Sequence, residues 1–168
     1  MKKQGFTLIE LMVVIVIMGI LAAVAVPKLF GMIAKSKASE VGPAAGTYVK
    51  LQQAYFSEAN MAGGWQLIGY MAPGTNSETT NFKYDPGAIA IGTSDALAQG
   101  KIGWQAGNKA NLNECSTGSG NAVVYHWNVT LTKQTGTSQD DVTFTATASA
   151  NNGTGCVALT PTFDKIGK

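Results

Sequence analysis

A long run without charge near the N-terminus constrains this chain more than any other feature. Leu11 to Pro27 carries no charged side chain, and extending the run back to Phe6 adds only Glu10. At about 1.5 Å per residue, a helix from Phe6 to Val26 would span about 31 Å, close to the roughly 30 Å hydrocarbon core of a bilayer. Lysines flank the run on both sides. The run therefore predicts a helix that lies in lipid or against other apolar surfaces.

Composition leaves two interpretations of this run open. The first is a secretory signal peptide with a small-residue cleavage site at Ala23-Val24-Ala25, which would release a secreted surface- or carbohydrate-binding module. The second is a retained membrane helix. Glu10 weighs against the signal peptide, because a carboxylate inside an apolar segment is costly unless it has a function. The helical pattern also continues beyond Pro27, which again favours the retained helix.

The apolar run continues into an amphipathic helix. Apolar side chains recur from Phe30 to Tyr55 at a mean step of about 3.6 residues, which is the α-helical period. The pattern predicts a single long helix from Phe6 to about Glu58. Prolines remove a helical hydrogen bond and glycines weaken a helix, so we expect kinks and softer helix inside this segment. The residues expected to soften it are Gly19, Pro27 and Pro43.

The C-terminal part of the chain predicts β-structure. Val123–Leu131 and Val142–Ala150 alternate between apolar and polar side chains, as strands with one buried face do. The polar stretch 134–141 between them predicts an antiparallel hairpin. Further strands are expected at Lys101–Gln105 and Cys156–Thr160. The amphipathic half of the long helix is the expected cover of the sheet, which gives an α+β fold.

The composition argues against an enzyme and against nucleic-acid binding. All 12 basic residues are Lys and the formal net charge is +2, which leaves no arginine for bidentate phosphate recognition. One His and two Cys are too few for a recognisable zinc-ligand set. The sequence has no P-loop, G-x-S-x-G or H-E-x-x-H motif, so common catalytic signatures are missing. We expect no catalysis, no cofactor, no resident metal and no specific nucleic-acid binding.

The start of the chain resembles the type IV pilin family. The resemblance rests on KKQGFTLIELMVV at 2–14 and ILAAVAVP at 20–27. It implies a leader peptide, residues 1–5, which a prepilin peptidase removes by cutting between Gly5 and Phe6. Phe6 would then be N-methylated. The resemblance also implies the pilin fold, a long N-terminal helix whose C-terminal half packs on an antiparallel β-sheet.

The resemblance implies a division of labour along the chain. Residues 6–29 would be the membrane anchor and filament core, and 30–168 the globular head, which includes the amphipathic helix 30–58. The precursor would lie in the inner membrane, contact lipid and the pilus assembly machinery, and then join other copies of itself in an extracellular filament for adhesion or motility. Glu10 would pair with the Phe6 amine of a neighbouring subunit.

A pseudopilin of type II secretion is the alternative within the same superfamily. Val26 to Gly31 is similar to the corresponding segment of those proteins. The Tyr-Pro-Thr-x-x-Gln-Gly-Leu stretch associated with the major pseudopilin is absent from this sequence. A major pilin is therefore the favoured interpretation.

The two cysteines enclose the predicted hairpin. Cys115 and Cys156 are either two buried thiols or a disulfide. The resemblance favours the disulfide, because the family works outside the cytoplasm, where oxidation is permitted.

A few single side chains carry weaker hypotheses. Trp65 follows Gly63-Gly64 in a loop and is the tryptophan that would suit surface binding, whereas Trp127 is in phase with the apolar face of its strand. His126 falls on the polar phase, which predicts a side chain facing solvent. The Asp140-Asp141 pair is a weak candidate for Ca²⁺.

Overall fold

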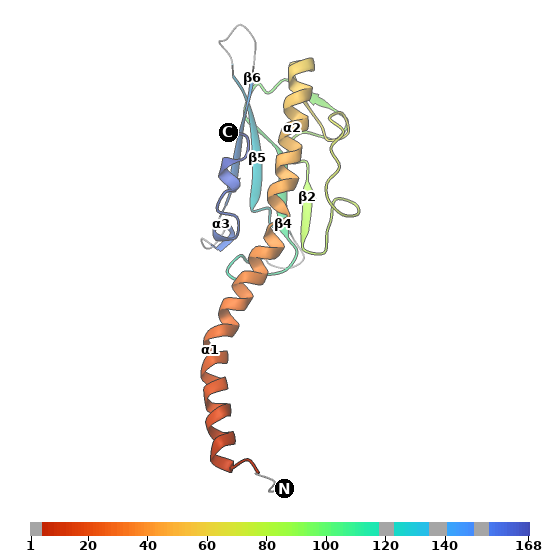
Figure 1. Ribbon diagram of the computed structural model, residues 1–168. Helices are drawn as coiled ribbons and strands as arrows, with labels where there is room; N and C mark the ends of the chain where they lie inside the picture. The colour runs from red at the N-terminus through yellow and green to blue at the C-terminus, as the bar shows by residue number, and fades with distance from the viewer. Residues whose placement is uncertain (1–4, 118–122, 135–140, 150–154) are drawn as a thin grey trace.

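The computed structural model describes residues 5–117, 123–134, 141–149 and 155–168. A helical stalk projects from a head that contains a β-sheet (Figure 1). Two helices follow each other along the chain: α1 (Leu8–Ala38), most of which forms the stalk, and α2 (Val41–Ala59), which runs along the head. The stalk is defined here as Leu8–Ile33, because Ala34 is the first residue of α1 that is buried.

The head is built on a four-stranded antiparallel sheet in the order β2-β4-β5-β6. Its strands are β2 (Phe82–Asp85), β4 (Lys101–Asn108), β5 (Trp127–Gln134) and β6 (Asp141–Ala148). A smaller pair joins β1 (Ala62–Gly63) to β3 (Ser94–Asp95). The C-terminal elements are α3 (Gly155–Leu159) and the 3-10 helix η1 (Phe163–Lys165). The α+β fold is therefore confirmed.

The long helix is interrupted at Ser39 and Glu40 and not at Pro27. Pro43 has no N–H to donate to the Ser39 carbonyl, and its ring would clash with that carbonyl in a regular helix. The Ser39 N–H donates to the Lys35 carbonyl at 3.0 Å, which closes α1. The expected single helix is thus two helices, whereas α1 passes through Pro27 as one curved helix (Figure 1).

Glu40 fixes this interruption to the head. Its Oε1 accepts hydrogen bonds from Thr79 Oγ1 at 2.6 Å and from the Tyr84 hydroxyl at 3.1 Å. Burial, and then the nearby Glu40 carboxylate, raise the pKa of Tyr84 above its usual value, so the hydroxyl keeps its proton and remains a donor. The point where the chain changes helix is therefore held against β2.

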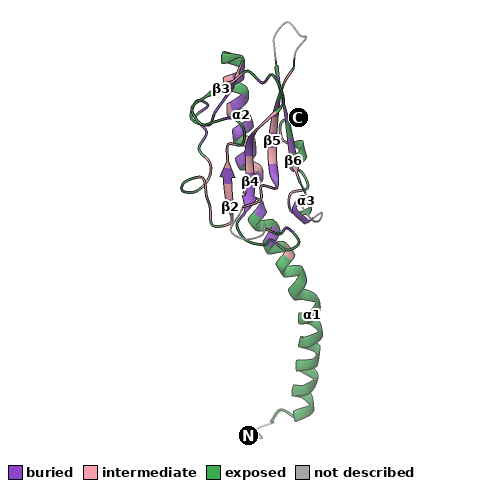
Figure 2. Cartoon of the chain, turned by 180° about the vertical axis from the view of Figure 1, so that it is seen from behind, coloured by how far each residue is buried: buried purple, intermediate pink, exposed green. Residues whose placement is uncertain are grey.

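The amphipathic stripe covers the sheet as expected. α2 packs against β4 and β6, and the buried faces of helix and sheet meet in a common core (Figure 2). The stripe is buried from Ala34 to Tyr48, whereas Phe30 is 62% exposed. Trp104 and Trp127 are fully buried, which confirms core packing for Trp127.

The strand predictions are confirmed in part. β5 and β6 form the expected antiparallel hairpin, with Leu131 opposite Phe144. β4 extends the predicted Lys101 strand to Asn108. β5 begins at Trp127, so 123–126 is not strand. The chain there passes over Gly107, where a Cβ would lie 2.4 Å from the Val124 carbonyl oxygen.

The strand expected at Cys156–Thr160 is wrong, because Gly155–Leu159 is the helix α3. A short apolar run does not by itself separate strand from helix. Cys156 and Leu159, three residues apart, are buried, whereas Val157 between them is 41% exposed. A spacing of three residues between buried positions fits a helix, and in this helix Cys156 faces the core.

Two single-residue predictions are also wrong. Trp65 is only 4% exposed, and its Nε1 donates to the Gly103 carbonyl at 3.0 Å. The preceding residue, Gly64, lies so close to the loop at Ala90 that a Cβ would lie 2.1 Å from the Ala90 carbonyl oxygen, so the Trp65 segment is held against the head. His126 is 1% exposed; it precedes β5, so the alternation of that strand does not apply to it. Asp140 lies outside the described residues.

Candidate functional site

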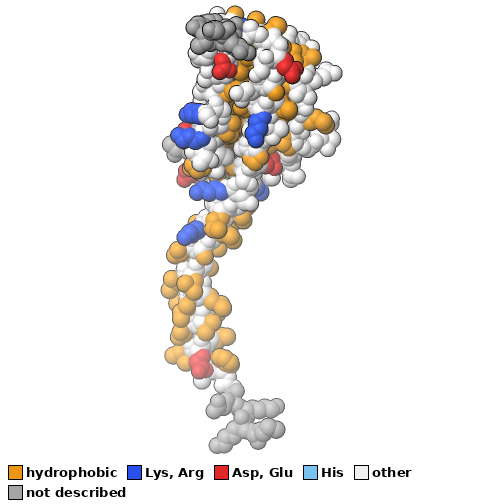
Figure 3. Space-filling view, turned by 45° about the horizontal axis from the view of Figure 1, so that its top comes forward, with side chains coloured by type: hydrophobic (Ala, Val, Ile, Leu, Met, Phe, Trp, Pro, Cys, Tyr) orange, Lys and Arg blue, Asp and Glu red, His pale blue; other side chains and the backbone are white. Residues whose placement is uncertain are grey.

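The stalk is an apolar helix that the rest of the described chain leaves exposed. Every residue from Leu8 to Ile33 is exposed except Gly31, which is half-buried. Hydrophobic side chains cover the face of the stalk seen in Figure 3, and lysines gather where the stalk meets the head. Burying one large apolar side chain is worth about 1.5–3 kcal/mol. A stalk with this many such side chains is unstable in water and requires a cover.

The apolar surface extends around the whole helix. Ile15, Val16, Ile17 and Met18 follow one another at about 100° per residue around the axis, and each is more than half exposed. A helix that is hydrophobic all round is either buried in an assembly or spans a membrane. Within the part of the chain that the structure describes, one helical segment, starting at Leu8, is long and apolar enough to cross a membrane. A signal sequence passes the same test.

Glu10 is part of a capping box at the tip of the stalk. The Thr7 backbone N–H and hydroxyl donate to Glu10 Oε2 at 2.8 and 2.7 Å, and the Glu10 N–H donates to Thr7 Oγ1 at 3.3 Å. These bonds satisfy N–H groups that a helix start leaves without partners. The one acidic group of the stalk is therefore hydrogen-bonded within its own chain.

Thr7 is the site residue that the sequence analysis missed. Thr at the N-cap with Glu three residues later is the sequence signature of a capping box. The Thr7-Leu8-Ile9-Glu10 run shows this pattern and would have identified it.

The predicted processing residues lie before the helix. Gly5, Phe6 and Thr7 are outside α1 and exposed, with Phe6 87% exposed. Thr7 has an extended backbone, with φ −79° and ψ 149°. Phe6 and Glu10 thus share the N-terminal end of the stalk, at the opposite end from the head (Figure 1).

Charged residues mark the other end of the stalk. Lys28, Lys35 and Lys37 are exposed on α1, just beyond the charge-free run.

An open groove of about 350 Å³ lies between α1 and the loop after β4, lined by Phe30, Ile33, Ala34, Lys37, Asn111, Leu112 and Asn113. The apolar surface of the stalk therefore continues to the edge of the head.

The predicted disulfide is present. Cys115 and Cys156 are bonded to each other, with a sequence separation of 41. The bond ties the segment after β4 to α3 and closes a loop that contains β5 and β6. Among the described residues, the one grouping of metal-ligating side chains is this cysteine pair with His126; in the oxidised chain both sulfurs are bonded to each other.

Comparisons with known proteins match short parts of the chain. Residues 1–26 match the family described as the prokaryotic N-terminal methylation motif. The chain is 46% identical over 57 residues to the type IV major pilin protein PilA of Myxococcus xanthus, covering 34% of this chain and 26% of that protein.

Two further relatives give similar matches. Identity to the fimbrial protein EcpC of Eikenella corrodens is 46% over 56 residues, which covers 33% of this chain and 37% of that protein. Identity to the type IV major fimbrial protein FimA of Dichelobacter nodosus is 56% over 39 residues, covering 23% and 25%. The chain thus spans about a quarter to a little over a third of the length of these curated relatives. No solved structure matches the chain.

Proposed function

We propose that this chain is a type IV pilin and the repeating structural subunit of a type IV pilus. The match of residues 1–26 to the N-terminal methylation motif and the similarity to type IV major pilins support this proposal. The observation that carries the proposal is the bare apolar stalk on a head that buries its own core. A head of this kind needs no partner for its stability, whereas the stalk does. Packing stalks together in a filament would supply that partner.

Before assembly, the stalk would hold the subunit in the inner membrane. The length of the stalk and its charge-free run from Leu11 to Pro27 suit a bilayer core. Assembly would then replace lipid contacts with contacts between stalks, so that the apolar surface stays out of water throughout. The head would remain outside the membrane and form the outer surface of the filament.

The N-terminal end suits proteolytic processing. A prepilin peptidase would cut between Gly5 and Phe6, and Phe6 would then be methylated on its new amine. An exposed, extended segment ahead of a capped helix can enter a protease active site without unfolding the helix. Cleavage there would leave the capping box of Thr7 and Glu10 complete.

Glu10 would set the register between subunits. Phe6 and Glu10 are four residues apart in the sequence, and the amine of one or the carboxylate of the other would each be costly alone in an apolar filament core. An amine from an incoming subunit could approach the Glu10 of a subunit already packed. Such a pair need not add net stability compared with apolar packing. Its value would be specificity, because uniform Leu, Ile and Val packing does not select one axial position.

The same proposal gives the filament a role in adhesion or motility. It also requires that the inner-membrane assembly machinery deliver the subunit to the cell surface. Two relatives carry the words major pilin or major fimbrial in their names, which supports a pilus subunit over a type II secretion pseudopilin. The buried position of Trp65 removes the residue that favoured a secreted binding module.

N-terminal sequencing combined with electron microscopy tests the proposal. Filaments sheared from cells that export this chain should contain it as the main component, starting with methylated Phe6. A mature chain that starts at Val26, in a soluble form without filaments, would show that residues 1–25 are a signal peptide.

A further inference from the structure

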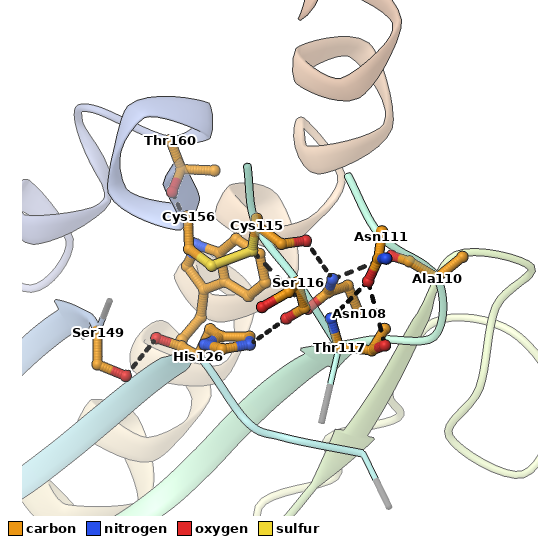
Figure 4. Close-up of a disulfide and its surroundings, with 11 residues drawn as sticks. Asn108, Ala110, Asn111, Cys115, Ser116, Thr117, His126, Ser149, Cys156 and Thr160 are labelled. Carbon is orange, nitrogen blue, oxygen red and sulfur yellow. Dashed lines mark hydrogen bonds between the residues drawn. A yellow bond between two sulfur atoms is a disulfide. The ribbon is translucent and has the colours of Figure 1, made fainter. Parts of the chain in front are cut away.

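We infer that, once its disulfide is reduced, this chain has a buried zinc site formed by Cys115, Cys156, His126 and Asn108. The inference concerns the head alone and goes beyond the proposed role in a filament. It rests on how side chains around the disulfide are aimed, and Figure 4 shows this arrangement.

The donor atoms are already gathered. One ligand atom each from Cys115, Cys156 and His126 lie within 4.8 Å of one another. The exposed fractions of these residues are 0%, 2% and 1%. A tetrahedral zinc ion needs metal–sulfur distances of about 2.3 Å and metal–nitrogen distances of about 2.0 Å, so only small movements would close the site once the sulfurs separate.

His126 has one ring nitrogen free to bind. Its Nε2 lies 2.9 Å from the Ser116 carbonyl oxygen. Because a carbonyl oxygen only accepts, Nε2 carries the hydrogen and Nδ1 keeps its lone pair. Nδ1 is buried without a hydrogen-bond partner among the described residues. A ligating histidine held by a backbone carbonyl at its other nitrogen is the usual outer arrangement of zinc sites.

Asn108 offers a fourth donor. Its Nδ2 donates to the Ala110 and Cys115 carbonyl oxygens, each at 3.0 Å. These two bonds fix the amide so that Oδ1 lies 3.8 Å from Cys115 Sγ. Asn108 is fully buried at 0% exposure. The amide oxygen of Asn108 therefore lies beside the cluster of two sulfurs and an imidazole nitrogen.

The chemistry of the donors selects the ion. Thiolate and imidazole ligands suit zinc, whereas Ca²⁺ and Mg²⁺ require oxygen ligands. A dithiol reductant would convert the disulfide to two thiols and itself become a disulfide. Zn²⁺ would then bind both sulfurs and release two protons. The metal and the disulfide exclude each other, because both use the same two sulfurs.

The consequence is a second way to hold the same segments together. Zinc would join the segment after β4 to α3 before oxidation, as the disulfide does afterwards. Thiolates bound to zinc are less available as nucleophiles. The metal would therefore also delay formation of the disulfide.

Metal binding by the full chain in detergent tests the inference. Three samples are titrated with Zn²⁺: the oxidised chain, the reduced chain and the reduced His126→Gln chain. Reduction uses a dithiol, which is then removed in the absence of air. Native mass spectrometry reports the stoichiometry, and competition with a chelator reports the affinity. We expect one zinc, with loss of two protons, on the reduced chain only. His126→Gln should bind at least about ten-fold more weakly.

Two results would overturn the inference. The first is a reduced chain that binds no stoichiometric zinc, or an oxidised chain that binds it equally well. The second is unchanged affinity in His126→Gln, when its oxidised form has the near-UV circular dichroism of the parent. If that variant fails to fold, Co²⁺ binding to the reduced parent decides: a tetrahedral spectrum with thiolate charge transfer supports the site, and its absence refutes it. Filament formation is not a readout here, so failure would leave the proposed function untouched.

Discussion

At the scale of single residues, the N-terminal turn of the stalk holds a carboxylate that an apolar helix would otherwise exclude. Thr7 donates twice to Glu10 Oε2, which reduces the cost of placing that carboxylate near lipid. In a filament, the same carboxylate would be close to the amine of a neighbouring Phe6. Glu10 is thus a cap in this structure, and in the proposed filament it would be the carboxylate by which stalks recognise their axial position.

Replacing Glu10 by Val should stop or sharply reduce filament formation while membrane insertion stays intact or improves. The reason is that the register signal is lost and the apolar surface is extended. Membrane fractionation with electron microscopy of the cell surface checks both effects, and N-terminal sequencing confirms processing after Gly5. Normal piliation by the processed Glu10→Val chain would refute the register role.

Thr7→Val is the matched control for this change. It removes the hydroxyl partner of Glu10 but keeps the carboxylate. Loss of such a cap costs about 1 kcal/mol of helix stability. We expect Thr7→Val filaments to form, so that loss of filaments in both variants would point to the cap and not to the charge.

The disulfide should dominate the stability of the head. It closes a loop with a sequence separation of 41, for which chain entropy gives roughly 4 kcal/mol of stabilisation. Reduction should therefore lower the free energy of unfolding by roughly 4 kcal/mol, which is measured as a lower urea midpoint. The measurement is made with a metal chelator present, so that no bound cation replaces the bond. Equal midpoints for oxidised and reduced chains would contradict this prediction.

Acid should weaken the attachment of the loop before β2. Hydrogen bonds from Lys109 and then Lys83 hold the pKa of Glu78 below its usual 4.5. A carboxyl with a lowered folded pKa stabilises the fold above the unfolded value and loses that contribution as pH falls through the folded value. The urea midpoint of the parent should therefore decrease as the pH is lowered below about 4.5. The midpoint of Glu78→Gln should decrease less steeply over the same pH range. Identical pH profiles for parent and variant would exclude this role.

At the scale of elements, the spacing of apolar residues correctly predicts which face of a helix or strand is buried. The stripe leading to Tyr48 and the alternation of β6 are buried as expected, because one face of each must meet the core. Pro27 and Pro43 look alike in sequence, yet the helix is interrupted only before Pro43. There, the missing N–H of Pro43 coincides with hydrogen bonds from Thr79 and Tyr84 to Glu40, which are contacts distant in sequence that Pro27 does not have beside it in the described residues.

The same limit applies to the site. Phe6 and Glu10 come from a contiguous motif, and a contiguous motif is visible in sequence. The backbone N–H of His126 donates to the Ala106 carbonyl of β4, and the His126 ring lies beside the disulfide between Cys115 and Cys156. These contacts are distant in sequence from the alternation that predicts exposure. Local alternation therefore gave the wrong exposure for His126.

In a filament, α1 should be bent or partly unwound between Gly19 and Pro27. Glycine is a poor helix former, and Pro27 has no N–H to donate. The isolated chain keeps regular helix there, as a helix in lipid must satisfy its own backbone bonds. A density map of the filament checks this, and continuous regular helix through this segment would contradict the prediction.

At the scale of the whole molecule, two parts with opposite solvent preferences share one chain. The head encloses its own core, held by a disulfide. The stalk presents apolar side chains on all sides. The central claim is that this stalk, and no surface of the head, carries assembly.

Removal of residues 1–30 tests this claim most directly. The change deletes the charge-free run and keeps the amphipathic stripe that covers the sheet. Sedimentation velocity without detergent, with electron microscopy of the same sample, measures the outcome. The account predicts a soluble monomer with no filaments at concentrations where the full chain requires detergent or assembles. Filaments formed by the truncated chain would contradict it.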